Sequence, residues 1–153
     1  SPLSRKINYL MPIAKELGCK TISIDYTMTK NPDVRVNILK DILKDEKDEC
    51  ILYGSSMGAY VSLAVAENNQ VKGLFLCAPA LYLEGYKIHT YQKADYPITI
   101  IHGKQDSIVP YEHSIQFAEK QNCELHLVND DHALSSSEEL IKILFQRFLI
   151  SII

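Results

Sequence analysis

Tryptophan is absent from this chain of 153 residues, and long hydrophobic runs are absent as well. No stretch approaches the roughly 18 consecutive apolar residues of a membrane-spanning helix, and the first residues lack the pattern of a secretory signal. Basic runs are also missing, and the formal net charge is -3. These absences argue against a nucleic-acid partner and a polybasic membrane anchor. We therefore predict a cytoplasmic protein with no membrane span, whose partner is a small-molecule substrate; its oligomeric state is left open.

The cysteines and histidines do not form a metal-binding pattern. No C-x-x-C pair occurs, and the histidines are not at ligand spacing from one another or from cysteine. Each cysteine lies at or within an apolar, strand-like run, which predicts buried free thiols. The four are Cys19, Cys50, Cys77 and Cys123. We expect neither a metal nor a cofactor, in keeping with a reducing cytoplasmic compartment.

Strand-like and helix-like segments alternate along the whole chain, and 46% of its residues are hydrophobic. This length and composition support one globular domain over residues 1–153. The alternation predicts the α/β class, with a doubly wound, mostly parallel sheet and helices on both faces. The expected helices are 5–17, 32–47, 57–68, 111–121 and 137–150, and the expected strands are 21–26, 50–53, 71–78, 98–102 and 123–128.

Local signals mark the ends of several of these elements. Ser4 is a good N-cap for the first helix, and Gly18 is placed to stop it. A capping box from Ser136 to Glu139 is expected to open the last helix, whose apolar end should pack against the domain. The segment 80–96 is irregular and rich in tyrosine.

A G-x-S-x-G run occupies residues 54–58, between a short apolar strand and a helix rich in small residues. This layout is that of a nucleophile elbow, a sharp strand-to-helix turn that presents a serine in a strained conformation. Residues two before and two after the serine must then lack colliding side chains, and Gly54 and Gly58 meet that demand. The pattern predicts Ser56 as a nucleophile. A Gly-Ser turn without chemistry is the plain alternative.

Two further residues follow in the order Ser, acid, His that this kind of site uses. Asp106 comes after an apolar strand and a glycine turn, and His132 comes after the last expected strand. In an open parallel sheet these loops share the carboxyl edge with Ser56. The alternatives are a turn-forming Asp106 and a solvated His132. His102 and His126 are rival bases, but neither follows the last strand, and 130–131 is interpreted as a surface turn.

These motifs resemble the α/β-hydrolase superfamily and, within it, the small YqiA-like serine esterases with little or no lid. The resemblance covers nearly the whole chain and rests on the runs SPLSRK at the N-terminus, GSSMGAY around Ser56, GKQDSIVP around Asp106 and DDHAL around His132. It implies an α/β-hydrolase fold with a minimal cap at 80–96. It also implies Ser56 as nucleophile, Asp106 as acid and His132 as base.

One part of the resemblance is missing. In that superfamily a strand and a His-Gly oxyanion loop precede the first helix, and the strand lies between those expected here at 21–26 and 50–53. The chain begins after that place, so the sheet is expected to carry a gap and two strands to lose a ladder partner. We predict that the natural protein is longer by roughly 10 to 20 residues, enough for one strand and a loop.

The expected chemistry is hydrolysis of an ester or thioester through an acyl-enzyme. The backbone N–H of Met57 is the expected first oxyanion donor, and the second is expected from the missing loop. Tyr82 and Tyr86 are candidates for a substrate pocket, although aromatic loop residues also serve to cover core. A non-catalytic binding module of the same fold is the main alternative, and an acyltransferase or a peptidase would use the same three residues.

Overall fold

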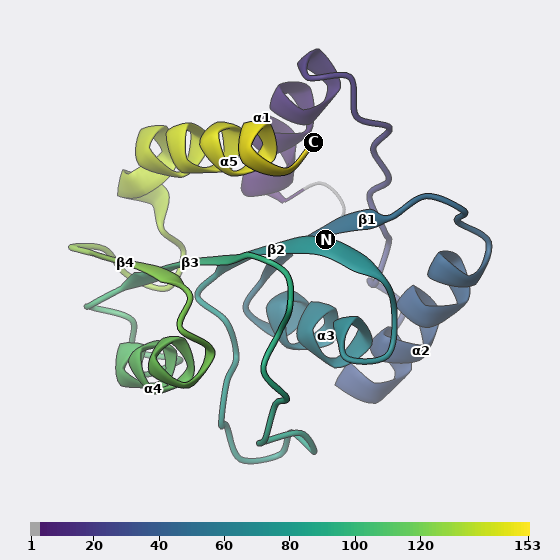
Figure 1. The fold of residues 1–153 in the computed structure, drawn as a ribbon. Coiled ribbons are helices and arrows are strands. Elements are labelled where there is room, and N and C mark those ends of the chain that lie inside the picture. The colour runs from purple at the N-terminus through teal and green to yellow at the C-terminus, as the bar shows by residue number, and fades with distance from the viewer. Residues whose placement is uncertain (1–3) are drawn as a thin grey trace.

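A four-stranded parallel sheet forms the centre of the computed structural model, which describes residues 4–153 (Figure 1). Its strands lie in the order β1-β2-β3-β4, and every neighbouring pair is parallel. Their bounds are β1 Cys50–Ser55, β2 Val71–Cys77, β3 Ile98–Gly103 and β4 Glu124–Val128. All of β3 and all but one residue of β2 are buried, as expected for strands covered on both faces. The predicted parallel α/β architecture is confirmed.

Helices cover both faces of this sheet (Figure 1). One face carries α2 Pro32–Lys44, α3 Met57–Ala66 and α4 Tyr111–Gln121, and the other carries α1 Arg5–Glu16 and α5 Glu138–Ile152. Successive strand residues point to opposite faces, so Ile100 belongs to the core under α3 whereas Ile101 belongs to the core under α5. The two layers together bury the sheet and leave its carboxyl edge to carry loops.

The signals predicted for the two ends of the first helix are confirmed. The Ser4 hydroxyl accepts from the Ile7 N–H at 3.4 Å, and Gly18 follows α1 with a φ of +84°. That left-handed conformation is open to glycine and ends the helix. Asn31 caps α2 by accepting from two N–H groups of its first turn. The helix stops at Lys44, earlier than the predicted 47, and the irregular segment 80–96 is confirmed.

The predicted strand over 21–26 is wrong. This segment leads from α1 to α2 without joining the sheet, which ends at β1. A strand exists through ladder hydrogen bonds to a neighbour, and β1 pairs with β2 alone among residues 4–153. Ile24 and Tyr26 still pack part of their surface on the core. The extra N-terminal strand stays a prediction, and the first three residues of the SPLSRK motif lie outside the described residues.

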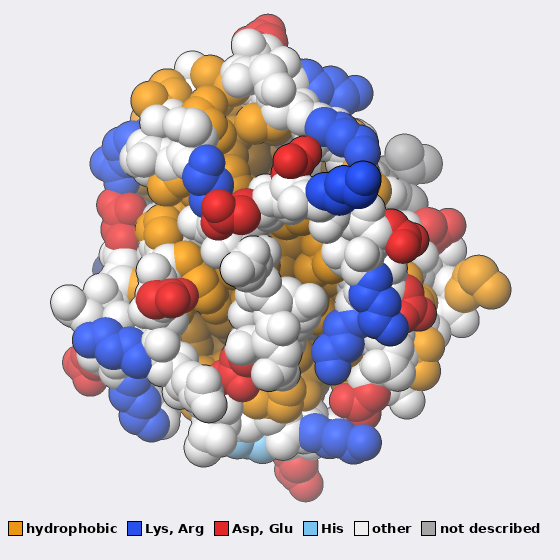
Figure 2. Space-filling model, turned by 45° about the vertical axis from the view of Figure 1, so that its right-hand side comes forward, with side chains coloured by type: hydrophobic (Ala, Val, Ile, Leu, Met, Phe, Trp, Pro, Cys, Tyr) orange, Lys and Arg blue, Asp and Glu red, His pale blue; other side chains and the backbone are white. Residues whose placement is uncertain are grey.

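Hydrophobic side chains are visible in hollows on the side of the molecule that faces the reader in Figure 2. This view brings forward the side on which β1 ends the sheet and α2 covers it. In the segment between α1 and α2, two apolar residues are strongly exposed, Ile22 at 53% and Met28 at 94%. Apolar surface on this side is therefore left uncovered by residues 4–153.

The expectation that all four cysteines are buried is wrong for three of them. Cys77 is fully buried near the end of β2, and burial raises the pKa of its thiol to about 12. Cys19, Cys50 and Cys123 are partly exposed because they lie at the ends of elements or just outside them. All four are free thiols.

Candidate active site

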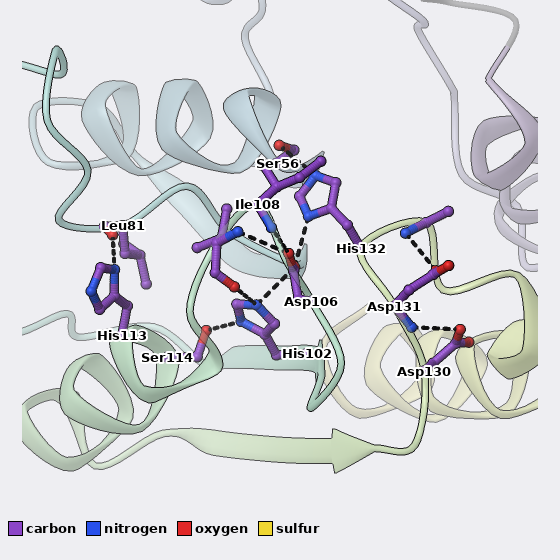
Figure 3. Close-up of polar contacts among 12 residues, drawn as sticks. Ser56, Leu81, His102, Asp106, Ile108, His113, Ser114, Asp130, Asp131 and His132 are labelled. Carbon is purple, nitrogen blue, oxygen red and sulfur yellow. Dashed lines mark hydrogen bonds and ion pairs between the residues drawn. The ribbon is translucent and has the colours of Figure 1, made fainter.

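Three loops at the carboxyl edge of the sheet bring Ser56, Asp106 and His132 together (Figure 3). Ser56 follows β1, Asp106 follows β3 and His132 follows β4. Parallel strands end at the same edge, which places these loops side by side although they are far apart in sequence. The structure thus joins the three residues that the sequence singled out.

Ser56 stands at the turn from β1 into α3 with a φ of 55° and a ψ of -118°. Such a conformation is strained for a residue with a side chain, and it persists where neighbouring bonds hold it. The Ser56 N–H donates to the Cys77 carbonyl at 2.9 Å, and the Ser56 carbonyl accepts from the Ala80 N–H at 3.1 Å. Its hydroxyl makes no capping bond to α3 and is free to face His132.

The two glycines of the elbow have different roles. A Cβ atom on Gly54 would lie 2.5 Å from the Gly58 carbonyl oxygen and 2.6 Å from the Ala59 nitrogen, so only glycine fits there. At Gly58 an added Cβ would meet nothing within 4 Å, and no left-handed φ requires glycine. The expectation that a side chain at 58 would collide is therefore wrong, because position 58 already lies within α3 and points into open space.

His132 bridges the other two residues through its two ring nitrogens. Its Nε2 lies 3.0 Å from Ser56 Oγ, and its Nδ1 lies 2.7 Å from Asp106 Oδ2. A carboxylate only accepts, so the partners assign the ring proton to Nδ1 and leave Nε2 to accept from the serine hydroxyl. The His132 side chain is 22% exposed, so the imidazole is not sealed from solvent. This tautomer has the free lone pair where a base needs it.

The Asp106 carboxylate is fully buried and receives hydrogen bonds on both oxygens. Its Oδ1 accepts from the N–H groups of Ile108 and Val109, each at 2.8 Å, and its Oδ2 accepts from His132. Burial opposes ionisation, but the bonds from Val109, His132 and Ile108 outweigh it and hold the pKa of Asp106 below its ordinary value. The group is therefore an anion, held in one orientation, beside the imidazole.

His102, one of the two rival bases, does not reach Ser56. Its Nε2 lies 3.0 Å from Asp106 Oδ2, on the far side of that carboxylate from His132 (Figure 3). The ring is fully buried, and burial lowers the pKa of His102, so it stays neutral. The other rival, His126, lies within β4 near Glu124. One local signal could have pointed to His102, which is its position four residues before Asp106 at the end of a strand.

The interpretation of 130–131 as a surface turn is wrong for Asp130, which is buried. Its Oδ1 accepts from the Asp131 N–H at 2.8 Å, and its Oδ2 accepts from the Ser136 N–H and the Ser137 hydroxyl, each at 2.9 Å. Its backbone carbonyl accepts from the Gln105 N–H, next to the catalytic-acid candidate. Asp130 therefore ties the loop of His132 both to the start of α5 and to the loop after β3.

The predicted capping box from Ser136 to Glu139 is also wrong. A 3₁₀ turn over Ser135–Ser137 precedes α5, and Ser137 is its N-cap residue without a capping bond from its side chain. The hydroxyl of Ser137 is instead bonded to Asp130, which also holds the Ser136 N–H. A carboxylate from the preceding loop thus holds the 3₁₀ turn that leads into α5.

Met57 is the first residue of α3, directly after Ser56. The first N–H groups of a helix have no partner within it, and the helix dipole makes them good anion donors. As the first residue of α3, Met57 has an N–H of this kind, as the predicted oxyanion donor requires. This assignment stays a prediction.

Tyr82 and Tyr86 lie in the irregular segment and make aromatic contacts. The ring of Tyr86 packs edge-on against Tyr60, with centroids 4.7 Å apart, and Tyr82 packs against His113 at 5.8 Å. Tyr82 also has a left-handed φ of 57°. Burial raises the pKa of both phenols. These contacts anchor the segment on α3 and α4, and the substrate-pocket assignment of both residues stays a prediction.

The described residues contain neither a metal-binding cluster nor a membrane-spanning helix. Within residues 4–153, no cluster of three or more histidine, cysteine, aspartate or glutamate side chains is arranged to hold a metal ion. No helix in this part of the chain has the length and apolar character needed to cross a bilayer.

Comparison with known families identifies the class of protein. Residues 28–141 match the alpha/beta hydrolase domain family, and the chain belongs to this family. The matched region contains Ser56, Asp106 and His132 with the strands that carry them. No curated protein matches the chain significantly.

Solved structures agree with this assignment. A hydrolase of the alpha/beta superfamily from Xanthomonas campestris pv. campestris shares 26% identity and a TM-score of 0.89, covering 99% of this chain and 92% of its own. Est1E from Butyrivibrio proteoclasticus shares 22% identity and a TM-score of 0.78, covering 99% and 83%. An alpha-beta serine hydrolase homologue from Coxiella burnetii shares 24% identity and a TM-score of 0.74, covering 97% and 78%. At 22% and 24% identity, the similarity to Est1E and to the Coxiella burnetii protein shows a shared fold.

Proposed function

We propose that this protein is a serine hydrolase that cleaves carboxylic esters or thioesters, with Ser56, His132 and Asp106 as its triad. The observation that carries the proposal is the double contact of His132, 3.0 Å to Ser56 Oγ and 2.7 Å to Asp106 Oδ2. A nucleophile next to a base, with that base oriented by a third group, is the arrangement that activates a serine hydroxyl. Membership of the alpha/beta hydrolase family supports the same reading.

In the first half of the reaction, Ser56 Oγ attacks the carbonyl carbon while His132 Nε2 takes the hydroxyl proton. Asp106 keeps the imidazole in its Nδ1–H tautomer and stabilises the imidazolium that forms. The Met57 N–H donates to the oxyanion of the tetrahedral intermediate. The bond to the alcohol or thiol then breaks, and His132 returns the proton to this leaving group. The product is an acyl-enzyme on Ser56.

Water completes the cycle. His132 takes a proton from a water molecule as the oxygen attacks the acyl carbon, and it returns the proton to Ser56 as the acid leaves. One oxyanion donor contributes about 100 to 1,000-fold in rate, so a second donor would raise the rate strongly.

The experiment that tests the proposal is labelling with a fluorophosphonate probe, followed by peptide mapping. The chain and its Ser56→Ala variant are compared, with Ser55→Ala as a matched control next to it. We expect labelling on the peptide that contains Ser56, unchanged by Ser55→Ala and lost in Ser56→Ala. Hydrolysis of p-nitrophenyl acetate and of a thioester should fall at least about 10,000-fold in Ser56→Ala.

The main alternative is a binding module of the same fold without activity. A folded chain that takes no label would favour this alternative and contradict the proposal. Acyltransferase activity would appear as acyl transfer to an added alcohol that outruns hydrolysis, and peptidase activity as cleavage of amide substrates by the same serine. A cytoplasmic location and a small-molecule substrate remain part of the proposal.

A further inference from the structure

Asp106 has a histidine on each side. Its Oδ2 lies 2.7 Å from His132 Nδ1 and 3.0 Å from His102 Nε2 (Figure 3). The mechanism proposed above uses His132 and leaves His102 without a role. The His102 imidazole is fully buried. Buried polar groups are normally hydrogen-bonded, so its partners, among them Asp106, show what the ring does in this place.

The partners of His102 define its tautomer. Its Nε2 faces two acceptors, Asp106 Oδ2 and the Val109 carbonyl, each at 3.0 Å, so this nitrogen carries the proton. Its Nδ1 lies 2.6 Å from the Ser114 hydroxyl of α4, which then donates to it. With the other tautomer, a lone pair would face two acceptors. The two acceptors at Nε2 thus select the form of His102 that donates toward Asp106, and the Ser114 hydroxyl, which can donate or accept, complements this form at Nδ1.

His102 also secures the loop that carries the acid. Val109 donates its N–H to Asp106 Oδ1 and accepts from His102 through its carbonyl. The turn that runs from Asp106 to Val109 is therefore bonded at both ends to the His102 imidazole. His102 itself belongs to β3 and is bonded to Ser114 of α4. The titratable groups facing His102 are Asp106 and His132. On the α4 side, His102 contacts the Ser114 hydroxyl, which does not titrate. On the β4 side, its partner in the sheet is Leu127.

We propose that His102, in its Nε2–H tautomer and held through Nδ1 by Ser114, is a positioning residue that orients the Asp106 carboxylate for His132. The proposal rests on the proposed function of the Ser56 site. His102 transfers no proton in the reaction; it supplies a neutral donor that directs Oδ2 toward the base. A continuous line of hydrogen bonds then runs from Ser114 through His102, Asp106 and His132 to Ser56.

Two substitutions of His102 distinguish the effect of its hydrogen-bond donor from the effect of its side-chain volume. In His102→Gln the side-chain amide can place an N–H near the original Nε2, whereas His102→Leu fills similar space without a donor. We expect His102→Leu to lower kcat for an ester about 10 to 100-fold with KM nearly unchanged, as for a displaced catalytic group. His102→Gln should keep most of kcat. His126→Leu, on the neighbouring strand, is the matched control and should leave kcat unchanged.

A second measurement does not require activity. Nitrogen NMR of His102 should report a neutral Nε2–H ring at about pH 7 to 8, in line with the lowered pKa of this buried group. The proton of His132 Nδ1 that faces Asp106 should give a signal that survives in His102→Gln and broadens in His102→Leu. Ser114→Ala should remove one hold on the ring of His102 and lower kcat several-fold, which provides a test even where His102→Leu fails to fold.

The outcomes are distinct. Equal losses in His102→Leu and His102→Gln would show that the shape of the side chain matters and its donor does not, which would overturn the proposal. Unchanged kcat in both variants, or an Nδ1–H tautomer, would overturn it as well. An unlabelled Ser56 would contradict the proposed function alone, because the NMR signals of His102 and His132 would then decide the positioning role by themselves.

Discussion

Gly54 lies so close to Gly58 that a Cβ atom on the first would come within 2.5 Å of the carbonyl oxygen of the second. This contact brings the end of β1 against the first turn of α3, which gives the elbow its sharp bend. The neighbouring Ala59 backbone closes the same space at 2.6 Å. Backbone atoms cannot move aside as a flexible side chain can, so the bend depends on the missing side chain at position 54.

Alanine substitutions at the two glycines should therefore have opposite results. Gly54→Ala forces strand and helix apart, and we expect it to abolish activity and to unfold the chain or lower its melting temperature strongly. Gly58→Ala meets open space in a helix, where alanine gains up to about 1 kcal/mol over glycine. Thermal unfolding of the two variants checks this. A Gly54→Ala variant as stable as Gly58→Ala would contradict the close packing of the elbow.

Replacing Asp106 with asparagine should affect activity and stability together. Every hydrogen bond to this carboxylate is donated to it, by two backbone N–H groups at Oδ1 and by two histidines at Oδ2. An amide must turn its NH₂ group toward one of these pairs of donors. We expect kcat to fall about 1,000 to 10,000-fold, since His132 loses the acceptor that selects its tautomer.

The loss of stability in Asp106→Asn should be about 1 to 3 kcal/mol, the usual cost of an unsatisfied buried group. Urea unfolding and ester kinetics measure the two effects. Asp131→Asn, at an exposed neighbouring carboxylate of the same loop system, is the control and should change neither. Wild-type kcat in Asp106→Asn would mean that His132 is oriented by another group.

The same residue gives a prediction about pH. The pKa of Asp106 lies below its ordinary value in the folded chain, so the unfolded chain takes up a proton first as the pH falls. Its contribution to the free energy of unfolding is therefore complete above about pH 4, the ordinary carboxyl range, and is lost as the pH falls through the folded pKa. In Asp106→Asn this part of the acid dependence should disappear.

Urea unfolding at a series of pH values between about 2 and 6 would measure it. Wild type and variant should differ most at the upper end and converge toward the lower end. Asp131→Asn, at an exposed carboxylate, serves as the control for the loss of one charge. Parallel curves for wild type and Asp106→Asn would show that Asp106 contributes nothing to acid unfolding.

The sequence contained enough to predict the catalytic candidates. The glycines around Ser56, the glycine turn before Asp106 and the place of His132 after the last strand are local patterns, and the parallel order of strands converts them into proximity. Asp130 and His102 could not be assigned in this way. Their partners lie on other elements, and a buried hydrogen bond between distant segments leaves no periodic signal in the chain.

The strand predicted at 21–26 failed for a related reason. Its apolar and β-branched residues fit an extended backbone, and the segment does remain outside any helix. Whether an extended segment becomes a strand depends on a neighbour with free N–H and C=O groups, which is a property of the assembled sheet. Propensity predicted the conformation of the backbone and had no information on the pairing.

The last prediction concerns the loop of His132. Asp130 accepts three hydrogen bonds through its carboxylate, from Asp131, Ser136 and Ser137, and its backbone packs on β3. An added Cβ on Gly103 would lie 2.7 Å from the Asp131 carbonyl oxygen, so the loop rests directly on the strand. Asp130→Ala leaves these donors without their acceptor while the loop stays close to β3.

We expect Asp130→Ala to lower the free energy of unfolding by about 1 to 3 kcal/mol and kcat about 10 to 100-fold, because His132 would move relative to Ser56. Asp131→Ala is the matched control: this exposed carboxylate accepts only from the Ala133 N–H within the loop itself among the contacts seen in residues 4–153. Its removal should cost little in either measurement. Equal effects of the two variants would show that the buried carboxylate has no special part in holding His132, whereas a loss confined to Asp130→Ala would place the anchor of the base at the junction with α5.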